Sequence, residues 1–350
     1  MLKPEASMGK RHGQLKIHVS KGLLLGLLAM GFGWGGHLPE AQALSYTYTT
    51  ILTPETINGN NAGTLAEQNR AFGINNSGAI SGSLIYFDQG YIDNNGTFTL
   101  IPGNFNGGGS QVFGINNNGA VVGSGGSQSG NFIYNNGAYT YLSGSTFDGF
   151  PLLPRGINNN NEVVGNNYFN PSNGYTNGFL YDNGNYTRIL PIGAGNYYSG
   201  AFGINDSGEI VGYYDNNGTS LGFVDNNGSF TSISAPNPSD NLVLYGISDN
   251  GYMVGTISGF NSFQSFIDEN GTFTTINVPG ATQTVVRGVN DSGDVVGYYT
   301  NSSGTFGFLG TPVSSVSATP EPSALVLVGS GLLLLGVARV FRQRFSLKKG

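Results

Sequence analysis

Of the chain's 350 residues, the stretch from Leu44 to Ala318 holds 17 acidic and only four basic side chains, a net charge of −13. Phosphate binding needs clustered Lys and Arg, so this charge argues against a nucleic-acid partner. The chain has no Cys, and its three His residues all precede Leu44. Thiolate metal sites, His-ligated zinc and Ser-His-Asp catalysis are therefore excluded from that stretch.

The first 43 residues have the pattern of a signal peptide. Four basic residues between positions 10 and 21 precede an apolar run at 22–34, and Ala41 and Ala43 supply the small side chains of a signal-peptidase site. The alternative is a retained transmembrane anchor, for which this apolar run is short and interrupted by Gly. We therefore expect export, with residues 1–43 removed.

Six copies of one short phrase organise residues 72–297. Each copy has a large residue, then Gly-Ile-Asn or a close variant, a polar turn with Gly, and an ending similar to Val-Val-Gly. The motif glycines are 41, 42, 47, 43 and 42 residues apart, at Gly73, Gly114, Gly156, Gly203, Gly246 and Gly288. A fixed period of this size is typical of propellers and solenoids.

One period has the pattern of four short strands. In residues 271–310, the segments TFTTI, VVRGVN, DVVGYY and TFGFLG have the alternation and β-branched content of strands. Asn, Asp and Gly occupy the connections, where they tolerate left-handed backbone angles. A unit of about 42 residues with four antiparallel strands has the size of a propeller blade.

The two ends of the array indicate how it closes. Counted from its Gly-Ile-Asn strand, the last copy stops after three strands, whereas residues 46–52, YTYTTIL, resemble the missing fourth strand. Such a strand would complete the last blade and protect its edge, and a solenoid has no reason to divide a repeat in this way. The sequence predicts an all-β, six-bladed propeller at residues 44–312, closed by the N-terminal strand. A β-solenoid and a β-sandwich are the alternatives.

Two sets of motif residues are expected to pack between the blades. They are the large residues before the motif glycine and the Ile residues after it: Phe72, Phe113, Phe202 and Tyr245, with Ile74, Ile115, Ile157, Ile204 and Ile247. Buried aromatic stripes usually serve packing, so we expect no ligand role for these side chains.

A binding function is expected on the face of the propeller that carries the longer loops. Asn/Asp-Gly turns follow the first and third strands of each unit, and longer, more variable loops follow the second and fourth. Aromatic residues near these loops are candidate platforms for sugar rings: Tyr168, Tyr175, Tyr197, Tyr198, Tyr213, Tyr214, Tyr298 and Tyr299, with Phe169, Phe260 and Phe263. The alternative is that many of them are half-buried residues at strand ends.

Catalysis in a body without His, Cys or Lys would depend on carboxylates. Asp148, Glu162, Asp215 and Asp240 are candidates for a glycosidase-like pair, but nothing in the sequence brings two of them together. A sialidase-like site needs clustered arginines, and the body has four: Arg70, Arg155, Arg188 and Arg287, of which Arg155 and Arg287 occupy equivalent repeat positions. The acidic turns at 205–209 and 290–294 offer too few oxygen ligands for Ca²⁺. We expect hairpin turns there, and neither a metal nor a cofactor.

The repeat resembles the HAF-repeat family of extracellular bacterial proteins. The resemblance rests on GFLYDNGNYTRI at 178–189, GFVDNNGSFTSI at 222–233 and the PGAT stretch at 279–282, and it covers nearly the whole body. The chain departs from the family at the His-Ala-Phe triplet, where it has Gly-Phe, Asn-Phe or Ser-Phe. The resemblance implies a structural or surface role without a defined active site.

The C-terminal segment resembles the PEP-CTERM sorting signal. Residues 313–319 form a Ser-rich linker, and residues 320–350 contain Pro320-Glu321-Pro322, an apolar run at 324–338 and the basic residues Arg339, Arg342 and Arg344. The resemblance implies a Gram-negative exporter and an exosortase-type sorting protease as a partner. A plain C-terminal anchor is the alternative, and in both cases the basic residues would lie on the cytoplasmic side.

These observations together predict a non-catalytic, exported propeller of the cell surface or extracellular matrix. It would be held transiently at the inner membrane by its C-terminal helix and would bind exopolysaccharide through the aromatic long-loop residues. A polysaccharide hydrolase or lyase that uses a carboxylate pair is the alternative function.

Overall fold

The computed structural model describes residues 44–53, 56–57, 60–61, 68–85, 89–102, 109–125, 130–142, 146–147, 150–167, 176–191, 198–260 and 262–313. The chain divides into two units, Met1–Gln42 and Ala43–Gly350, and the strands of the described ranges belong to the second unit. Every helix or strand found in the described ranges is a β-strand. The all-β class predicted from the sequence is therefore confirmed for this part of the chain.

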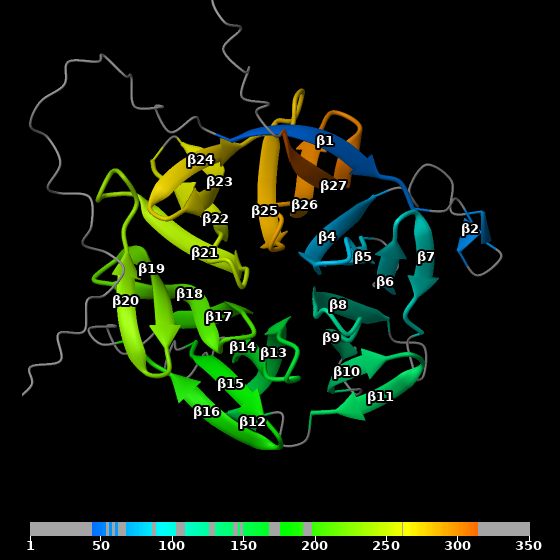
Figure 1. The fold of residues 1–350 in the computed structure, drawn as a ribbon, viewed down its shortest axis with the longest axis horizontal. Helices are drawn as coiled ribbons and strands as arrows, with labels where there is room; N and C mark the ends of the chain where they lie inside the picture. Colours follow the sequence, from blue (N-terminus) through cyan, green and yellow to red (C-terminus); the bar gives the residue numbers. More distant parts are fainter. Residues whose placement is uncertain are drawn as a thin grey trace, which may run out of the picture. The chain divides into compact units, whose positions relative to one another are not determined.

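The strands form antiparallel sheets that follow one another along the chain (Figure 1). The first two groups of four are β4 (Asn69–Ile74), β5 (Ile80–Leu84), β6 (Gln89–Asn94) and β7 (Thr97–Leu100), then β8 (Ser110–Ile115), β9 (Val121–Gly125), β10 (Asn131–Asn135) and β11 (Ala138–Tyr141). One parallel pair, Gln89 with Ser110, joins these two groups into a single sheet.

The next sheets continue the same order. The third contains β12 (Thr146–Phe147), β13 (Phe150–Ile157), β14 (Val163–Asn167), β15 (Gly178–Asp182) and β16 (Asn185–Ile189). It is followed by β17 (Ser199–Ile204), β18 (Glu209–Asn216), β19 (Thr219–Asn226) and β20 (Ser229–Ile233), and by β21 (Asn241–Ile247), β22 (Met253–Ser258), β23 (Phe263–Glu269) and β24 (Thr272–Ile276). A separate short pair consists of β2 (Thr56–Ile57) and β3 (Asn60–Asn61).

The last sheet takes strands from both ends of the array. It contains β25 (Gln283–Val289), β26 (Val295–Asn301), β27 (Gly304–Val313) and β1 (Ser45–Ile51). β1 pairs with β27 along its whole length, with Ser45 opposite Val313 and Ile51 opposite Gly307. The Tyr46 hydroxyl also donates a hydrogen bond to the Gly293 carbonyl at 3.0 Å. The N-terminal strand thus covers an edge of β27 that would otherwise expose unpaired backbone groups.

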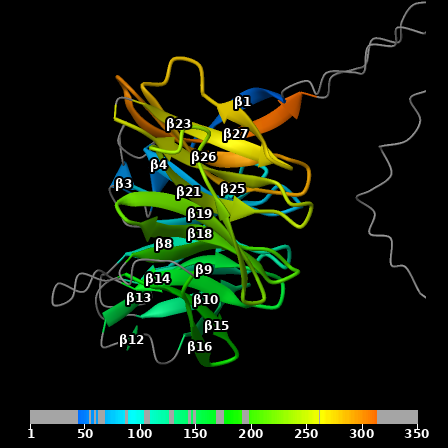
Figure 2. The same ribbon diagram turned by 90° about the vertical axis from the view of Figure 1, so that its left-hand side faces the viewer.

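The sheets are arranged around a common centre, as in a β-propeller. The first strand of each repeat, represented by β4, β8, β17, β21 and β25, lies nearest to that centre (Figure 1). Seen from the side, the strands run roughly along the viewing direction of Figure 1 (Figure 2). Several of the predicted four-stranded sheets are confirmed, and their first strands surround the common centre (Figure 1).

The hydrophobic core lies between neighbouring sheets. One cluster joins Val164 and Ile189 of the third sheet to Ala201 and Ile204 of the next. Another joins Ile51 and Val296 of the last sheet to side chains of β4 and β5. Each sheet therefore buries its apolar side chains against the sheets that follow and precede it, which is how a propeller excludes water without helices.

Glycines in the second strands make room for aromatic rings of the third strands. A Cβ atom on Gly212 would lie 2.9 Å from Cε1 of Phe223, a ring that is completely buried, and it would also overlap the Gly200 carbonyl oxygen. The Val-Val-Gly ending of the repeated phrase is thus required by close packing within the sheet.

Candidate functional site

A β-bulge occurs in each central strand beside the motif glycine. The register with the next strand shifts between Ala71 and Gly73 in β4 and between Ala201 and Gly203 in β17, and the other four central strands show the same shift. A bulge leaves a residue without a partner and redirects its side chain. The residues at this position are Phe72, Phe113, Arg155, Phe202, Tyr245 and Arg287.

These six side chains line a cavity of about 300 Å³ on the central axis. Arg70, Gln111 and Tyr298 complete its lining. Arg70 and Gln111 lie near the starts of their strands, so the cavity lies at the end of the axis where the longer loops connect the strands. The bulged residues therefore line a cavity on the face where the sequence predicted binding.

Aromatic and guanidinium groups alternate around this cavity. Phe72 and Phe113 form one aromatic pair, and Phe202 and Tyr245 form another, each with ring centroids 5.4 Å apart. The Arg155 guanidinium carbon lies 4.7 Å from the Phe113 centroid and 6.0 Å from the Phe202 centroid. Arg155 therefore lies between the two pairs and makes cation–π contacts with both.

Arg287 and Arg70 make similar contacts at the opposite side of the ring. The Arg287 guanidinium carbon lies 3.9 Å from the Tyr245 centroid and 5.7 Å from the Tyr298 centroid. The Arg70 guanidinium carbon lies 5.0 Å from the same Tyr298 ring. Two guanidinium groups thus share one tyrosine at the edge of the cavity.

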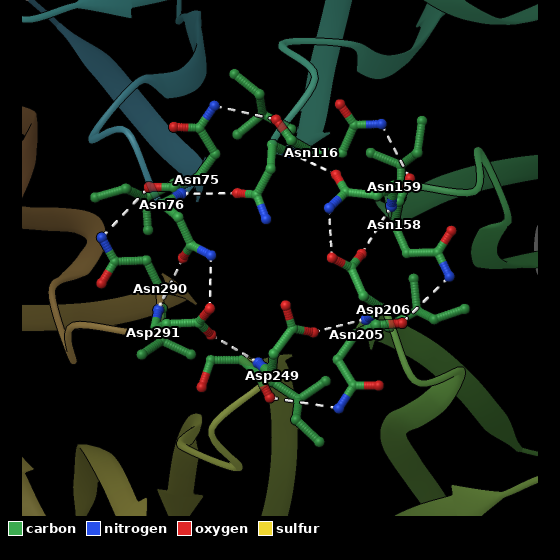
Figure 3. A pocket seen from close by; sticks show the side chains of 18 residues that line it. Asn75, Asn76, Asn116, Asn158, Asn159, Asn205, Asp206, Asp249, Asn290 and Asp291 are labelled. Carbon is green, nitrogen blue, oxygen red and sulfur yellow. Dashed lines mark hydrogen bonds between the residues drawn. The ribbon is translucent and has the colours of Figure 1, made fainter.

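The other end of the axis carries a ring of amide and carboxylate side chains (Figure 3). The backbone N–H of the second turn residue donates to the side-chain oxygen of its equivalent in the next unit, at 2.7 to 3.0 Å. This chain of bonds runs from Asn76 to Asn117, Asn159, Asp206, Asp249 and Asp291 and returns to Asn76. The cavity that these side chains surround has a volume of only about 60 Å³.

A second set of bonds lies directly beneath the first. The side-chain amides of Asn75, Asn116, Asn158, Asn205 and Asn290 each donate to the carbonyl of the equivalent residue in the next unit, at 2.9 to 3.4 Å. The Asn of the Gly-Ile-Asn phrase is therefore a structural residue that joins neighbouring turns. Burial raises the pKa of Asp249 in this ring, and the carboxylates of Asp206 and Asp291 raise it further.

The acidic turns are part of this hydrogen-bonded ring. In the described ranges, no group of three or more His, Cys, Asp or Glu residues is arranged to hold a metal ion. The Asp206 and Asp291 side chains accept hydrogen bonds from backbone N–H groups of the preceding units, as do the neutral Asn side chains at equivalent positions. They have the hairpin-turn role that we expected for them.

The large residues before the motif glycines were expected to pack between blades. Phe113 is buried as expected, with 6% of its surface exposed, but the expectation was wrong for the other three. Phe72, Phe202 and Tyr245 are only half-buried and face the axial cavity. The bulge interrupts the strict alternation of the strand, so Phe202 does not share a face with Ile204, which is 7% exposed and packs in the core. The Ile residues occupy the core as expected, except for Ile247, which is half-buried at its edge.

Two of the candidate glycan-binding tyrosines lie in or beside the wall of the axial cavity. Tyr298 lines the axial cavity, and Tyr213 stacks on Phe202 with centroids 5.7 Å apart and an angle of 13°. Burial raises the pKa of Tyr213, and the nearby Arg155 guanidinium acts in the opposite direction. Tyr298 therefore lies in the cavity wall, and Tyr213 lies directly behind a residue of that wall.

Other tyrosines of this set lie elsewhere. Tyr214 is only 4% exposed, because the pleat of β18 directs it into the core, so it offers no free ring to a sugar. Tyr299 packs against Phe306 and bonds to the Thr50 hydroxyl at 3.0 Å. Tyr198 is 39% exposed, as a platform requires. Phe260 and Phe263 are exposed too, whereas Tyr168, Phe169, Tyr175 and Tyr197 lie outside the described residues.

The candidate catalytic carboxylates occupy separate turns. Glu162 accepts a bond from Asn158, Asp215 accepts one from the Gly218 N–H, and Asp240 accepts one from Asn237. None of the three lines the axial cavity. Asp148 lies outside the described residues.

The targeting segments also lie outside the described residues. They contain Ala41 and Ala43 of the expected cleavage site, the Pro320-Glu321-Pro322 motif, and Arg339, Arg342 and Arg344. Among the residues that are described, no helix has the length and apolar character needed to cross a membrane.

Comparisons with known proteins add little to these observations. No protein-family model matches the chain, and no curated protein matches its sequence. Among solved structures, virginiamycin B lyase from Staphylococcus aureus is 13% identical, with a TM-score of 0.45 over 76% of this chain and 99% of that chain.

Two other structures show similarity of the same order. PQQ-bound aldose sugar dehydrogenase from Streptomyces coelicolor is 12% identical, with a TM-score of 0.41 over 76% of this chain and 98% of that chain. The β-propeller domain of the Trilobed protease from Pyrococcus furiosus is 10% identical, with a TM-score of 0.39 over 69% and 94%. Similarities as low as these assign neither an activity nor a ligand to this chain.

Proposed function

We propose that this protein is a closed, six-bladed β-propeller that binds glycans without modifying them. The ring of hydrogen bonds through the six motif turns supports six blades and closure, because it runs from Asn76 through five equivalent turns and back to Asn76. The pairing of β1 with β27 supports closure by the N-terminal strand. Such closure protects sheet edges from pairing with other chains.

The aromatic lining of the axial cavity is the observation that carries the binding proposal. Small-molecule sites are concave and mostly apolar or aromatic, with a few polar groups that orient the ligand. The cavity combines Phe72, Phe113, Phe202, Tyr245 and Tyr298 with three arginines and Gln111. The rings offer apolar faces to the C–H groups of a sugar, and the polar groups offer partners for its hydroxyls.

A hydrolase or lyase is the less favoured function. It requires two carboxylates on opposite sides of a bound sugar, about 5 to 10 Å apart. Glu162, Asp215 and Asp240 are each occupied by hydrogen bonds within their own turns, and none reaches the cavity. These contacts favour binding over turnover.

The place of action that we propose is the cell surface or the extracellular matrix. The signal-peptide pattern at residues 1–43 and the PEP-CTERM-like segment at 320–350 support export, transient attachment to the inner membrane and release by an exosortase-type protease. The HAF-like repeats agree with a surface role. An extracellular polysaccharide is the corresponding ligand.

A glycan array probed with the purified protein tests this function. We expect binding to polysaccharide fragments. Replacing Phe202 or Tyr298 by Ala should lower the affinity about tenfold or more, because the sugar ring loses an aromatic surface on which it stacks. Tyr141→Ala is the matched control, because that ring is 43% exposed and lies outside the cavity. Absence of binding to every glycan, or cleavage of a bound glycan, would contradict the proposal.

A further inference from the structure

Positive charge in the body is concentrated at the axial cavity. Of the four arginines between Leu44 and Ala318, three line this cavity: Arg70, Arg155 and Arg287. Among the residues that line it, none is acidic. A stretch with a net charge of −13 thus places nearly all its cations in one cavity of about 300 Å³.

Two of these guanidinium groups contact the same aromatic ring, that of Tyr298, and no acidic residue lines the cavity that they share. Arg70 and Arg287 both lie within 6 Å of the Tyr298 centroid, and no ion pair involves either of them in the described ranges. The Arg287 Nη2 donates to the Tyr298 hydroxyl at 3.3 Å, and its buried Nε has no hydrogen-bond partner among the described residues. Like charges that line one cavity repel each other, so a bound anion is favoured there.

Arginine has a specific preference among anions. Its planar guanidinium group binds carboxylates through two parallel hydrogen bonds, which fixes the orientation of the anion. The cation–π contacts with Tyr245 and Tyr298 hold the Arg287 group in place before a ligand binds. A volume of about 300 Å³ lies at the lower end of the range for small-molecule sites and suits one sugar unit.

We propose that the axial cavity binds a uronic acid unit of an acidic polysaccharide. Arg70 and Arg287 hold its carboxylate, Arg155 adds attraction from the opposite side, and the aromatic pairs contact the sugar ring. This inference rests on the proposed glycan-binding function and adds the chemical class of the glycan.

Calorimetric titration of the purified protein with trigalacturonate and triglucuronate, each compared with its methyl ester, tests the inference. The ester keeps the sugar rings and removes the charge. We expect each ester to bind about tenfold more weakly or worse, which corresponds to about 1.4 kcal/mol. Binding of the acids should also weaken with salt, because the attraction is electrostatic.

Variants locate the charged contact. Arg287→Gln and Arg70→Gln should weaken binding of the acid at least about tenfold and weaken binding of the ester much less, because the ester carries no charge to pair with the guanidinium groups. Arg188→Gln is the matched control, because Arg188 lies on β16 and does not line the cavity. Arg70 is exposed, so its variant is expected to fold even where Arg287→Gln does not, and the ester comparison needs no variant.

The outcomes separate this inference from the function on which it rests. Equal binding of acid and ester with unaffected arginine variants would overturn the uronate site and leave glycan binding standing. Binding of acetate or inorganic phosphate as tightly as the uronates would overturn the choice of a sugar. Absence of binding to these acids together with every neutral glycan would overturn both proposals.

Discussion

Asn205 has two structural roles in one side chain. Its Oδ1 accepts hydrogen bonds from the N–H groups of Ser207 at 3.1 Å and Glu209 at 2.9 Å, which closes its own turn. Its Nδ2 donates to the Ser248 carbonyl of the next unit at 3.4 Å. Ser248 takes the place of Asn in that unit and has only a hydroxyl, which accepts from the Tyr252 N–H at 3.2 Å.

Exchanging these side chains should change stability in opposite directions. Asn205→Ser removes the bond between units and should lower the free energy of unfolding by about 1 kcal/mol, the usual net value of a hydrogen bond. Ser248→Asn supplies a missing amide and should raise it by a similar amount. Denaturant unfolding measures both changes, and two variants that unfold like the wild type would show that the amide ring does not contribute to stability.

Asp225 is a buried carboxylate that limits stability at neutral pH. It closes an Asn-Asn-Gly hairpin turn by accepting the Gly228 N–H at 2.6 Å, and it is 7% exposed. Burial raises its pKa above the ordinary value of 3.8, with the bond from Gly228 acting in the opposite direction. Because the raised pKa favours the protonated folded form, stability falls as the pH rises from 3.8 through the folded pKa.

Asp225→Asn should therefore stabilise the protein more at neutral pH than in acid. The amide oxygen can still accept the Gly228 N–H, and the cost of burying a charge is removed. We expect the difference in melting temperature between variant and wild type to grow as the pH rises through this window. Asp93 and Asp268 occupy similar turns and have raised pKa values for the same reason, so their Asn variants should show the same sign. A difference that is constant between pH 3 and pH 7 would contradict this account.

At the scale of elements, the bulge in each central strand determines what the strand presents to the axis. Without it, Phe202 and Ile204 would lie on one face of β17, as their spacing in the sequence indicates. With it, Phe202 faces the cavity and Ile204 packs in the core. The same small distortion in all six copies therefore places side chains around the axial cavity.

The strand β1 is the element whose loss should have the largest effect. Deletion of Ser45–Ile51 would expose the whole edge of β27 and remove the packing of Tyr48 on Phe308, whose centroids are 5.9 Å apart. We expect a lower melting temperature and oligomers in size-exclusion chromatography, because an unpaired edge recruits other chains. Thr49→Ser is the control, since that exposed side chain leaves the strand pairing intact. An unchanged, monomeric deletion variant would argue against a role for β1 in closing the fold.

At the scale of the whole molecule, the two ends of the central axis differ in chemistry. One end is closed by neutral amides and three carboxylates, and the other is open, aromatic and lined with arginine. A ligand with negative charge is repelled by the first end and by the acidic body, and it is attracted by the second. The binding that we propose is therefore expected at a single face.

The processing that we propose for the C-terminal segment is tested on the whole chain. Replacing Pro320-Glu321-Pro322 by Ala should leave a heavier, membrane-bound form in the native host, because a sorting protease would no longer recognise the segment. The intact mass of the mature wild-type protein provides the second measurement. A mature species that still ends at Gly350 would support a plain anchor and contradict the sorting signal.

The sequence by itself determined the repeat period and the strands of each repeat, and it indicated that the N-terminal strand pairs with the last repeat. The Gly-Ile-Asn repeats and the Asn-Gly turns are local features of the sequence, so strands and turns can be predicted from local backbone preferences. The same signals identified the face with the long loops and the equivalent positions of Arg155 and Arg287.

Only the tertiary structure decided what those positions do. Bulges cannot be recognised from alternation alone, so Phe202 was assigned to the core although it faces the axis. Arg70, Arg155 and Arg287 lie 85 and 132 residues apart in the chain and meet only because the sheets turn around one centre. The axial cavity is formed by residues of distant repeats, and no single repeat carries a sequence signal for such contacts.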